Sequence, residues 1–221
     1  MGDVRRVLVI NVNLSKDTLD GCREIAKAIK SLRPGLDPVI RHWEECVREV
    51  LDVSAWDAFV LGPNETPFPA YPPSFKIFLD CVKALNGPLL GICGGHQVLG
   101  LAYGARVGPV FDIPAPTVSY EGLPKVQGPV ELRNLAPQES LLDSLEGTLI
   151  LDASHVEELE DTPEGFRLLV TGSPCKVQIM GHATKPVFGV QCHPERLWGA
   201  TDGRTLLGNF LAIVDVTRGS A

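Results

Sequence analysis

Short apolar runs alternate with amphipathic segments along the first half of this chain. Residues 7–10, 58–61 and 88–92 contain no charged side chain and are rich in valine, isoleucine and leucine, which is typical of strands buried on both faces of a parallel sheet. The alternation predicts strands over 7–10, 38–40, 58–61 and 88–92, and helices over 17–32, 44–50, 74–85 and 96–103. Strand–helix–strand repeats of this kind imply right-handed crossovers and a parallel sheet with helices on both faces.

The second half of the chain has a different pattern. Short apolar runs separated by turn residues predict strands over 130–133, 148–151, 167–170, 177–180 and 187–191, the last of which returns to the central sheet. Residues 202–216 predict a closing helix. With 221 residues and no linker, the chain is expected to form one α/β domain over residues 1–221. We expect a mostly parallel central sheet and a small antiparallel add-on sheet.

The charge balance argues against several classes of partner. Lys and Arg number 20 and Asp and Glu 27, which gives a net charge of −7 and leaves no general excess of basic side chains for nucleic acid or an anionic membrane. No apolar run reaches the roughly 18 residues of a transmembrane helix. The first apolar run is too short for a signal peptide, so we expect a cytoplasmic protein.

The six cysteines are scattered along the chain and include no C-x-x-C pair. Disulfides and a zinc site are therefore not expected, and His42 and His182 lack the spacing of metal ligands. We expect no bound metal and no cofactor. Five of the six cysteines are interpreted as small buried apolar residues.

Cys93 is the exception, because it stands where an apolar strand gives way to a helix. Residues 91–97 read GICGGHQ, which is the cysteine form of a nucleophile elbow. Glycines two residues before and after the cysteine relieve crowding at the sharp turn, and the following helix N-terminus favours a thiolate. The alternative is a glycine-rich turn that contains a buried cysteine.

A second motif, GVQCHPE over residues 189–195, contains the base that such a nucleophile needs. His193 precedes a proline, so its backbone is expected to be extended, and in an extended segment residues two apart point to the same side. Glu195 can then orient the imidazole while the other ring nitrogen faces the nucleophile. Alone, this motif is also compatible with a strand-end histidine beside a solvated glutamate.

Together, residues 91–97 and 189–195 resemble the class I (triad) glutamine amidotransferases, and the resemblance extends over nearly the whole chain. It includes residues 60–63, 153–157 and 201–211. Within the family, the sequence most resembles the glutaminase domain of GMP synthetases and standalone proteins like it. The resemblance implies a flavodoxin-like sheet and hydrolysis of the L-glutamine side-chain amide through a γ-glutamyl thioester.

The resemblance also implies roles for particular residues. Cys93 would be the nucleophile, His193 the general base and acid, and Glu195 the group that orients His193. The N–H groups of Gly62 and Gly94 would form the oxyanion hole. The substrate would be bound by Gln97, Ser154, His155, Val156 and Glu157, chiefly through the backbone of residues 154–157.

Some positions depart from the family pattern or have a simpler explanation. Leu61 replaces the first glycine of the usual Gly-Gly-Pro, and Cys192 stands where an aromatic residue often precedes the catalytic histidine. We expect Cys192 to be buried and to face away from His193, and the side chains of His96 and His155 to be structural. The proline-rich segment 63–73 is expected to be mobile and to form part of a lid.

The sequence has no phosphate-binding P-loop. We therefore expect a glutaminase that supplies ammonia to an ATP-dependent synthetase subunit in a separate chain. The alternatives are a standalone γ-glutamyl hydrolase that acts on a glutamyl conjugate, and a non-catalytic glutamine-binding module.

Overall fold

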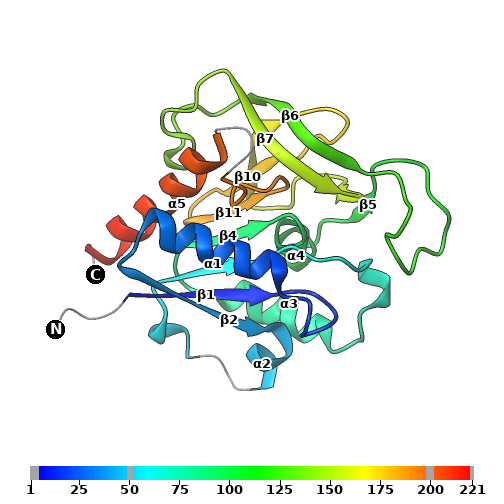
Figure 1. Cartoon of the computed structure of the whole chain (residues 1–221), viewed down its shortest axis with the longest axis horizontal. Coiled ribbons are helices and arrows are strands. Elements are labelled where there is room, and N and C mark those ends of the chain that lie inside the picture. The colour runs from blue at the N-terminus through cyan, green and yellow to red at the C-terminus, as the bar shows by residue number, and fades with distance from the viewer. Residues whose placement is uncertain (1–4, 49–51, 198–201, 220–221) are drawn as a thin grey trace.

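The computed structural model describes residues 5–48, 52–197 and 202–219. One sheet of nine strands dominates it, in the order β2-β1-β3-β4-β11-β10-β9-β6-β7 (Figure 1). The strands are β1 (Arg5–Asn11), β2 (Leu36–His42), β3 (Ala58–Leu61), β4 (Leu89–Ile92), β6 (Val126–Asn134), β7 (Thr148–His155), β9 (Phe166–Thr171), β10 (Ile179–His182) and β11 (Val187–Val190). A separate antiparallel pair is formed by β5 (Val107–Pro109) and β8 (Glu157–Leu159).

Helices cover both faces of the parallel half, which comprises β2, β1, β3, β4 and β11. The helices are α1 (Asp20–Leu32), α2 (Trp43–Arg48), α3 (Phe75–Ala84), α4 (Gly94–Ala102) and α5 (Asp202–Gly219). Val7 and Val9 of β1 pack in the core beneath α1 and α5, whereas Leu8 and Ile10 pack in the core beneath α2, α3 and α4. Burial of both faces explains why these strands read as continuous apolar runs.

The antiparallel strands of the second half extend the central sheet, and the expected small antiparallel add-on sheet is the pair β5–β8. Strands β10, β9, β6 and β7 follow β11 in antiparallel pairing. The individual strands β5 and β8 were not predicted from the sequence, because strands of three residues are too short to show an alternating pattern. The α/β class, the parallel sheet and its two helical layers are confirmed.

Element boundaries differ from the predictions at a few places. Helix α1 begins at Asp20 and not at residue 17, and α4 begins directly after Cys93. Strand β10 is shifted two residues along the chain, and its pairing with β9 is irregular between Ile179 and Met180. Residues 49–50 of the predicted second helix and residue 201 lie outside the described residues.

The fold brings three strand ends to one place. Strands β3, β4 and β11 are neighbours, and Ile92 at the end of β4 lies opposite Val190 at the end of β11. The segments that follow these strands therefore meet at the carboxyl edge of the sheet, where ligands bind in open α/β folds. Within the part of the chain that the structure describes, no helix has the length and apolar character needed to cross a membrane.

Candidate active site

Cys93 occupies a strained turn between β4 and α4. Its φ of 52° and ψ of −106° lie in a region that residues other than glycine seldom adopt, and such strain is typical of functional sites. The backbone is held by the Cys93 N–H, which donates to the Val190 carbonyl at 2.8 Å, and by the Gln97 N–H, which donates to the Cys93 carbonyl at 3.1 Å. The thiol is largely buried, and its sulfur lies 3.8 Å from the Ser154 carbonyl oxygen.

The two glycines that flank the cysteine are required by close backbone contacts. A Cβ at Gly91 would lie 2.5 Å from the Gly95 carbonyl oxygen, and a Cβ at Gly95 would lie 2.2 Å from the Leu61 carbonyl oxygen. Both distances are far below van der Waals contact. The glycines therefore allow β4 to turn into α4 immediately, so that Cys93 stands at the edge of the sheet.

His193 and Glu195 follow β11 and form a buried pair. The His193 Nδ1 atom lies 2.8 Å from the Glu195 Oε1 atom, and both side chains are almost completely buried. The segment is tied to β7, because the His193 N–H donates to the Asp152 carbonyl at 2.8 Å and Arg196 pairs with the Asp152 carboxylate. The remaining ring nitrogen, Nε2, forms no hydrogen bond of normal geometry with any described residue.

The charge environment favours a protonated imidazole at His193. Burial alone lowers its pKa, but the negative charges of Glu195 and Cys93 outweigh burial and raise the pKa well above the ordinary value for histidine. The imidazole also interacts with the Cys93 sulfur. At neutral pH His193 can therefore hold a proton beside the thiol, which is the state that delivers a proton to a leaving group.

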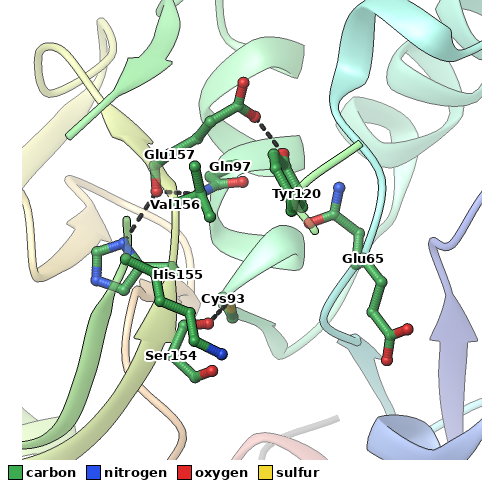
Figure 2. A pocket seen from close by; sticks show the side chains of 10 residues that line it. Glu65, Cys93, Gln97, Tyr120, Ser154, His155, Val156 and Glu157 are labelled. Carbon is green, nitrogen blue, oxygen red and sulfur yellow. Dashed lines mark hydrogen bonds between the residues drawn. The ribbon is translucent and has the colours of Figure 1, made fainter. Parts of the chain in front are cut away.

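A cavity of about 170 Å³ opens beside the Cys93 thiol. It is lined by Asn64, Glu65, Cys93, Gln97, Tyr120, Lys125, Ser154, His155, Val156 and Glu157. All five residues that the sequence predicted as substrate-binding are among them, so the fold brings them to the nucleophile. Figure 2 shows the side chains of Glu157, Gln97, Tyr120 and Glu65 around this space. A second cavity of about 230 Å³ lies between Cys93, the His193–Glu195 pair and Asp20 at the start of α1.

Gln97 and His155 hold the wall of the first cavity in place. The Gln97 side-chain amide donates to the Glu157 carbonyl oxygen at 2.7 Å, and the His155 Nδ1 atom lies 3.0 Å from the same oxygen. In Figure 2 these two bonds converge on the Glu157 backbone. Both side chains are buried. They therefore fix the position of Glu157, whose carboxylate accepts a hydrogen bond from the Tyr120 hydroxyl.

The structure corrects one of the two expected oxyanion donors. The Gly62 N–H donates to the Ile10 carbonyl at 2.9 Å, so it is part of the sheet and is not free. Gly94 is the first residue of α4, where the helix itself leaves the N–H without an acceptor. Asn64 lies directly against Gly94, since a Cβ on Gly94 would fall 2.5 Å from the Asn64 backbone nitrogen.

The segment after β3 is anchored, contrary to the expectation of a mobile lid. Asn13 holds it through two bonds, because its Nδ2 donates to the Pro63 carbonyl and its Oδ1 accepts from the Glu65 N–H. The Tyr71 hydroxyl donates to the Val12 carbonyl at 2.8 Å, and its ring packs on Phe75. Residues 63–71 are thus tied to the end of β1 and to α3.

Comparison with known proteins identifies the family. The glutamine amidotransferase class-I family matches residues 26–213, which include the elbow and the His193–Glu195 pair. The chain belongs to this family. It is 36% identical over 136 residues to the glutamine-hydrolyzing GMP synthase subunit of Methanosarcina barkeri, and the match covers 62% of this chain and 65% of that protein, slightly less than two thirds of its length. It is 35% identical over 144 residues to the protein of the same name in Methanocaldococcus jannaschii, covering 64% and 69%.

Solved structures show the same fold. A protein from Thermoplasma acidophilum that is described as a GMP synthase subunit superposes with a TM-score of 0.77 at 21% identity, covering 99% of this chain and 98% of that one. A glutamine amidotransferase from Thermotoga maritima superposes with a TM-score of 0.68 at 15% identity, covering 96% and 99%. The architecture described above is thus that of the class I glutamine amidotransferases.

The other histidines and cysteines near the candidate site of this family member are buried. Burial lowers the pKa of His96 to about 3 and that of His155 to about 4, so both are neutral at pH 7. Cys192 is fully buried, and its sulfur lies 3.4 Å from the Gln178 side-chain oxygen. No group of three or more metal-binding side chains occurs in the described ranges 5–48, 52–197 and 202–219.

Five residues near the site were missed by the sequence analysis. They are Asn13, Asn64, Glu65, Tyr120 and Lys125. The two asparagines had a readable signal, because each closely follows a buried strand that ends at the carboxyl edge. Tyr120 and Lys125 lie in the irregular connection 110–125, where no periodic pattern shows which side chains point inward.

Proposed function

We propose that this chain is a glutaminase that hydrolyses the side-chain amide of L-glutamine and supplies the ammonia to an ATP-dependent synthetase in a separate chain. The observation that carries this proposal is the placement of Cys93 on a strained elbow, beside both a ligand-sized cavity and the buried His193–Glu195 pair. Membership of the class I family supports it. The names of the archaeal relatives, which describe a glutamine-hydrolyzing subunit of GMP synthase, support the same conclusion.

The first half of the reaction forms a covalent intermediate. His193 takes the thiol proton and becomes the imidazolium that its charge environment favours, and the Cys93 thiolate then attacks the side-chain amide carbon of glutamine. The carbonyl oxygen becomes an oxyanion, which the Gly94 N–H at the start of α4 is placed to stabilise. When the C–N bond breaks, the protonated His193 gives its proton to the nitrogen, and ammonia leaves the γ-glutamyl thioester.

The second half releases glutamate. His193, now neutral, removes a proton from a water molecule that attacks the thioester carbon. The C–S bond breaks, the sulfur recovers a proton from His193, and glutamate departs. Glu195 does not exchange a proton in this scheme: it holds the imidazole and stabilises its charged form.

The geometry supports low activity in the isolated chain. The Gly62 N–H is already bonded to the Ile10 carbonyl, so this chain offers fewer free donors to an oxyanion than the family pattern implies. Loss of one such donor costs a reaction about 10²–10³-fold in kcat. A synthetase that displaced residues 62–65 from the end of β1 would free this N–H and couple hydrolysis to demand for ammonia.

A steady-state assay of glutamate release tests the proposal. The chain is assayed alone and with a GMP synthetase chain, ATP and the acceptor nucleotide. We expect slow release alone and a rise of about tenfold or more with the partner. Release at about 10 s⁻¹, the median kcat of enzymes, without a partner would favour a standalone hydrolase. Absence of release under all conditions, with glutamine still bound, would favour a binding module.

A further inference from the structure

The connection between β5 and β6, residues 110–125, is anchored at both ends to residues 155–157, which line the cavity beside Cys93. At its start, Pro109 of β5 pairs with Glu157 of β8, and the Val110 N–H donates to the Val156 carbonyl at 2.9 Å. At its end, Val126 of β6 pairs with His155 of β7. The connection therefore arches beside residues 155–157, and Figure 1 shows it protruding next to β5.

Two side chains of this connection reach the cavity. The Tyr120 hydroxyl donates to the carboxylate of Glu157, and Figure 2 shows its ring pointing into the space beside Cys93. Lys125 also lines the cavity and directly precedes Val126, so its backbone position is fixed by the β6–β7 pairing. A long irregular connection that is fixed at both ends and contributes side chains to a site is typical of a functional loop.

The charges around the cavity match a free amino acid. Among the described residues that line it, Glu65 and Glu157 are the carboxylates and Lys125 is the cation, since His155 is neutral at pH 7. Glu157 is 8% exposed; burial raises the pKa of its carboxyl above the ordinary value, and the hydrogen bond from the Tyr120 hydroxyl opposes that rise. A buried carboxylate and an exposed lysine that line the same cavity are complementary to the α-ammonium and α-carboxylate of one substrate molecule.

We propose that the 110–125 connection selects free L-glutamine: Lys125 binds the α-carboxylate, and Tyr120 positions Glu157 to bind the α-ammonium. This inference rests on the proposed function, because it specifies the substrate of the same cavity. Lys125 is then a binding residue, whereas Tyr120 is a positioning residue that acts through Glu157. Glutamyl compounds that lack either free charge, such as peptides, would be rejected.

Equilibrium binding to the full chain carrying Cys93→Ala tests this, because no turnover occurs. Isothermal titration calorimetry is done with L-glutamine, with L-glutamine α-amide, which lacks the carboxylate, and with N-acetyl-L-glutamine, which lacks the ammonium. Lys125→Met should weaken binding of L-glutamine at least about tenfold, the loss expected for a charge-assisted hydrogen bond, and should leave the affinity for the α-amide unchanged. Lys125→Arg should retain the preference for the free carboxylate.

The second part of the binding experiment uses Tyr120→Phe. It should weaken binding of L-glutamine several-fold and leave the affinity for N-acetyl-L-glutamine unchanged, because that analogue has no ammonium for Glu157. Matched controls are Lys185→Met on an exposed turn and Tyr103→Phe at the end of α4, which should bind all three ligands like the parent. The thermal midpoint of each variant shows that it is folded.

The outcomes separate this inference from the proposed function. Equal loss of affinity for L-glutamine and both analogues, or no loss in Lys125→Met and Tyr120→Phe, would overturn the inference even if the chain with Cys93 intact releases glutamate. Selective losses for L-glutamine would support the inference even if the intact chain released no glutamate, in which case only the proposed function would fail.

Discussion

The parallel and antiparallel halves of the sheet contribute different parts of the candidate site. In the parallel half, Cys93 lies on a turn fixed by backbone contacts, and the His193–Glu195 segment follows directly after β11. In the antiparallel half, the cavity wall is the β7–β8 junction together with the 110–125 connection, and these are held by side-chain bonds from Gln97, His155 and Tyr120.

Under the proposed function, this difference separates the reaction from substrate selection in physical terms. Covalent chemistry needs a nucleophile and base held within fractions of an ångström, which strand ends and backbone contacts provide. Selection of a substrate by its charged end needs a few polar side chains, and these can be supplied by a connection whose sequence is free to vary. Substitutions in the two halves should therefore have different signatures: loss of kcat for the first and loss of affinity for the second.

The largest effect is expected for Cys93→Ala in the parallel half. Removal of the nucleophile should lower glutamate release by about 10⁴-fold or more, while glutamine still binds and the thermal midpoint is retained. A glutamine analogue with an electrophilic side chain should label Cys93 and no other cysteine, as measured by peptide mass spectrometry. Cys192→Ala, at a buried site that faces Gln178, is the control. Equal labelling of Cys192 or Cys175 would contradict the assignment.

Glu195→Gln should have a smaller effect, because it removes the charge that orients His193 but leaves the nucleophile and the base. We expect kcat to fall less than in Cys93→Ala, since the orienting carboxylate is the least costly member of a triad to remove, and KM to change little. Glu164→Gln on an exposed turn is the matched control. If Glu195→Gln were as inactive as Cys93→Ala with an intact fold, Glu195 would have a more direct role than orientation.

Gly95→Ala tests whether the elbow depends on close backbone contact. The new Cβ would lie 2.2 Å from the Leu61 carbonyl oxygen, so β3 and α4 must separate, and we expect a loss of about 1–3 kcal/mol in the free energy of unfolding. Gly208→Ala in α5, where a Cβ would meet nothing within 4 Å, should instead stabilise by about 0.5–1 kcal/mol. Urea unfolding of both variants gives the comparison, and equal effects would argue against a contact-limited elbow.

The two halves also differ in how much the sequence could predict. Strands β3, β4 and β11 were predicted to within one residue, because burial on both faces produces uninterrupted apolar runs, and the motifs 91–97 and 189–195 begin inside β4 and β11. Strands β1 and β2 extend up to two residues beyond the predicted ranges. The presence of Tyr120 and Lys125 at the cavity could not be predicted, because it depends on which strands anchor the 110–125 connection. Whether the Gly62 N–H is free or bonded to the Ile10 carbonyl could not be predicted either, because the same sequence is compatible with both states.

A further expected effect concerns acid stability, to which each half contributes one buried histidine. His96 on α4 and His155 on β7 have pKa values of about 3 and about 4, because burial disfavours their charged forms. The unfolded chain binds protons at these positions below about pH 6.5, whereas the folded chain does not until these lower values. The contribution of each neutral histidine to the free energy of unfolding is therefore fully present above pH 6.5 and is lost as pH falls, by about 1.4 kcal/mol per pH unit.

His96→Leu should remove one of these contributions, so between pH 7 and pH 5 the variant should lose about 2 kcal/mol less than the wild type in urea unfolding. His182→Leu, at a site that is only partly buried, should change the pH dependence much less. If the free energy of unfolding of His96→Leu fell with pH as steeply as that of the wild type, the acid sensitivity would come from the antiparallel half or from carboxylates.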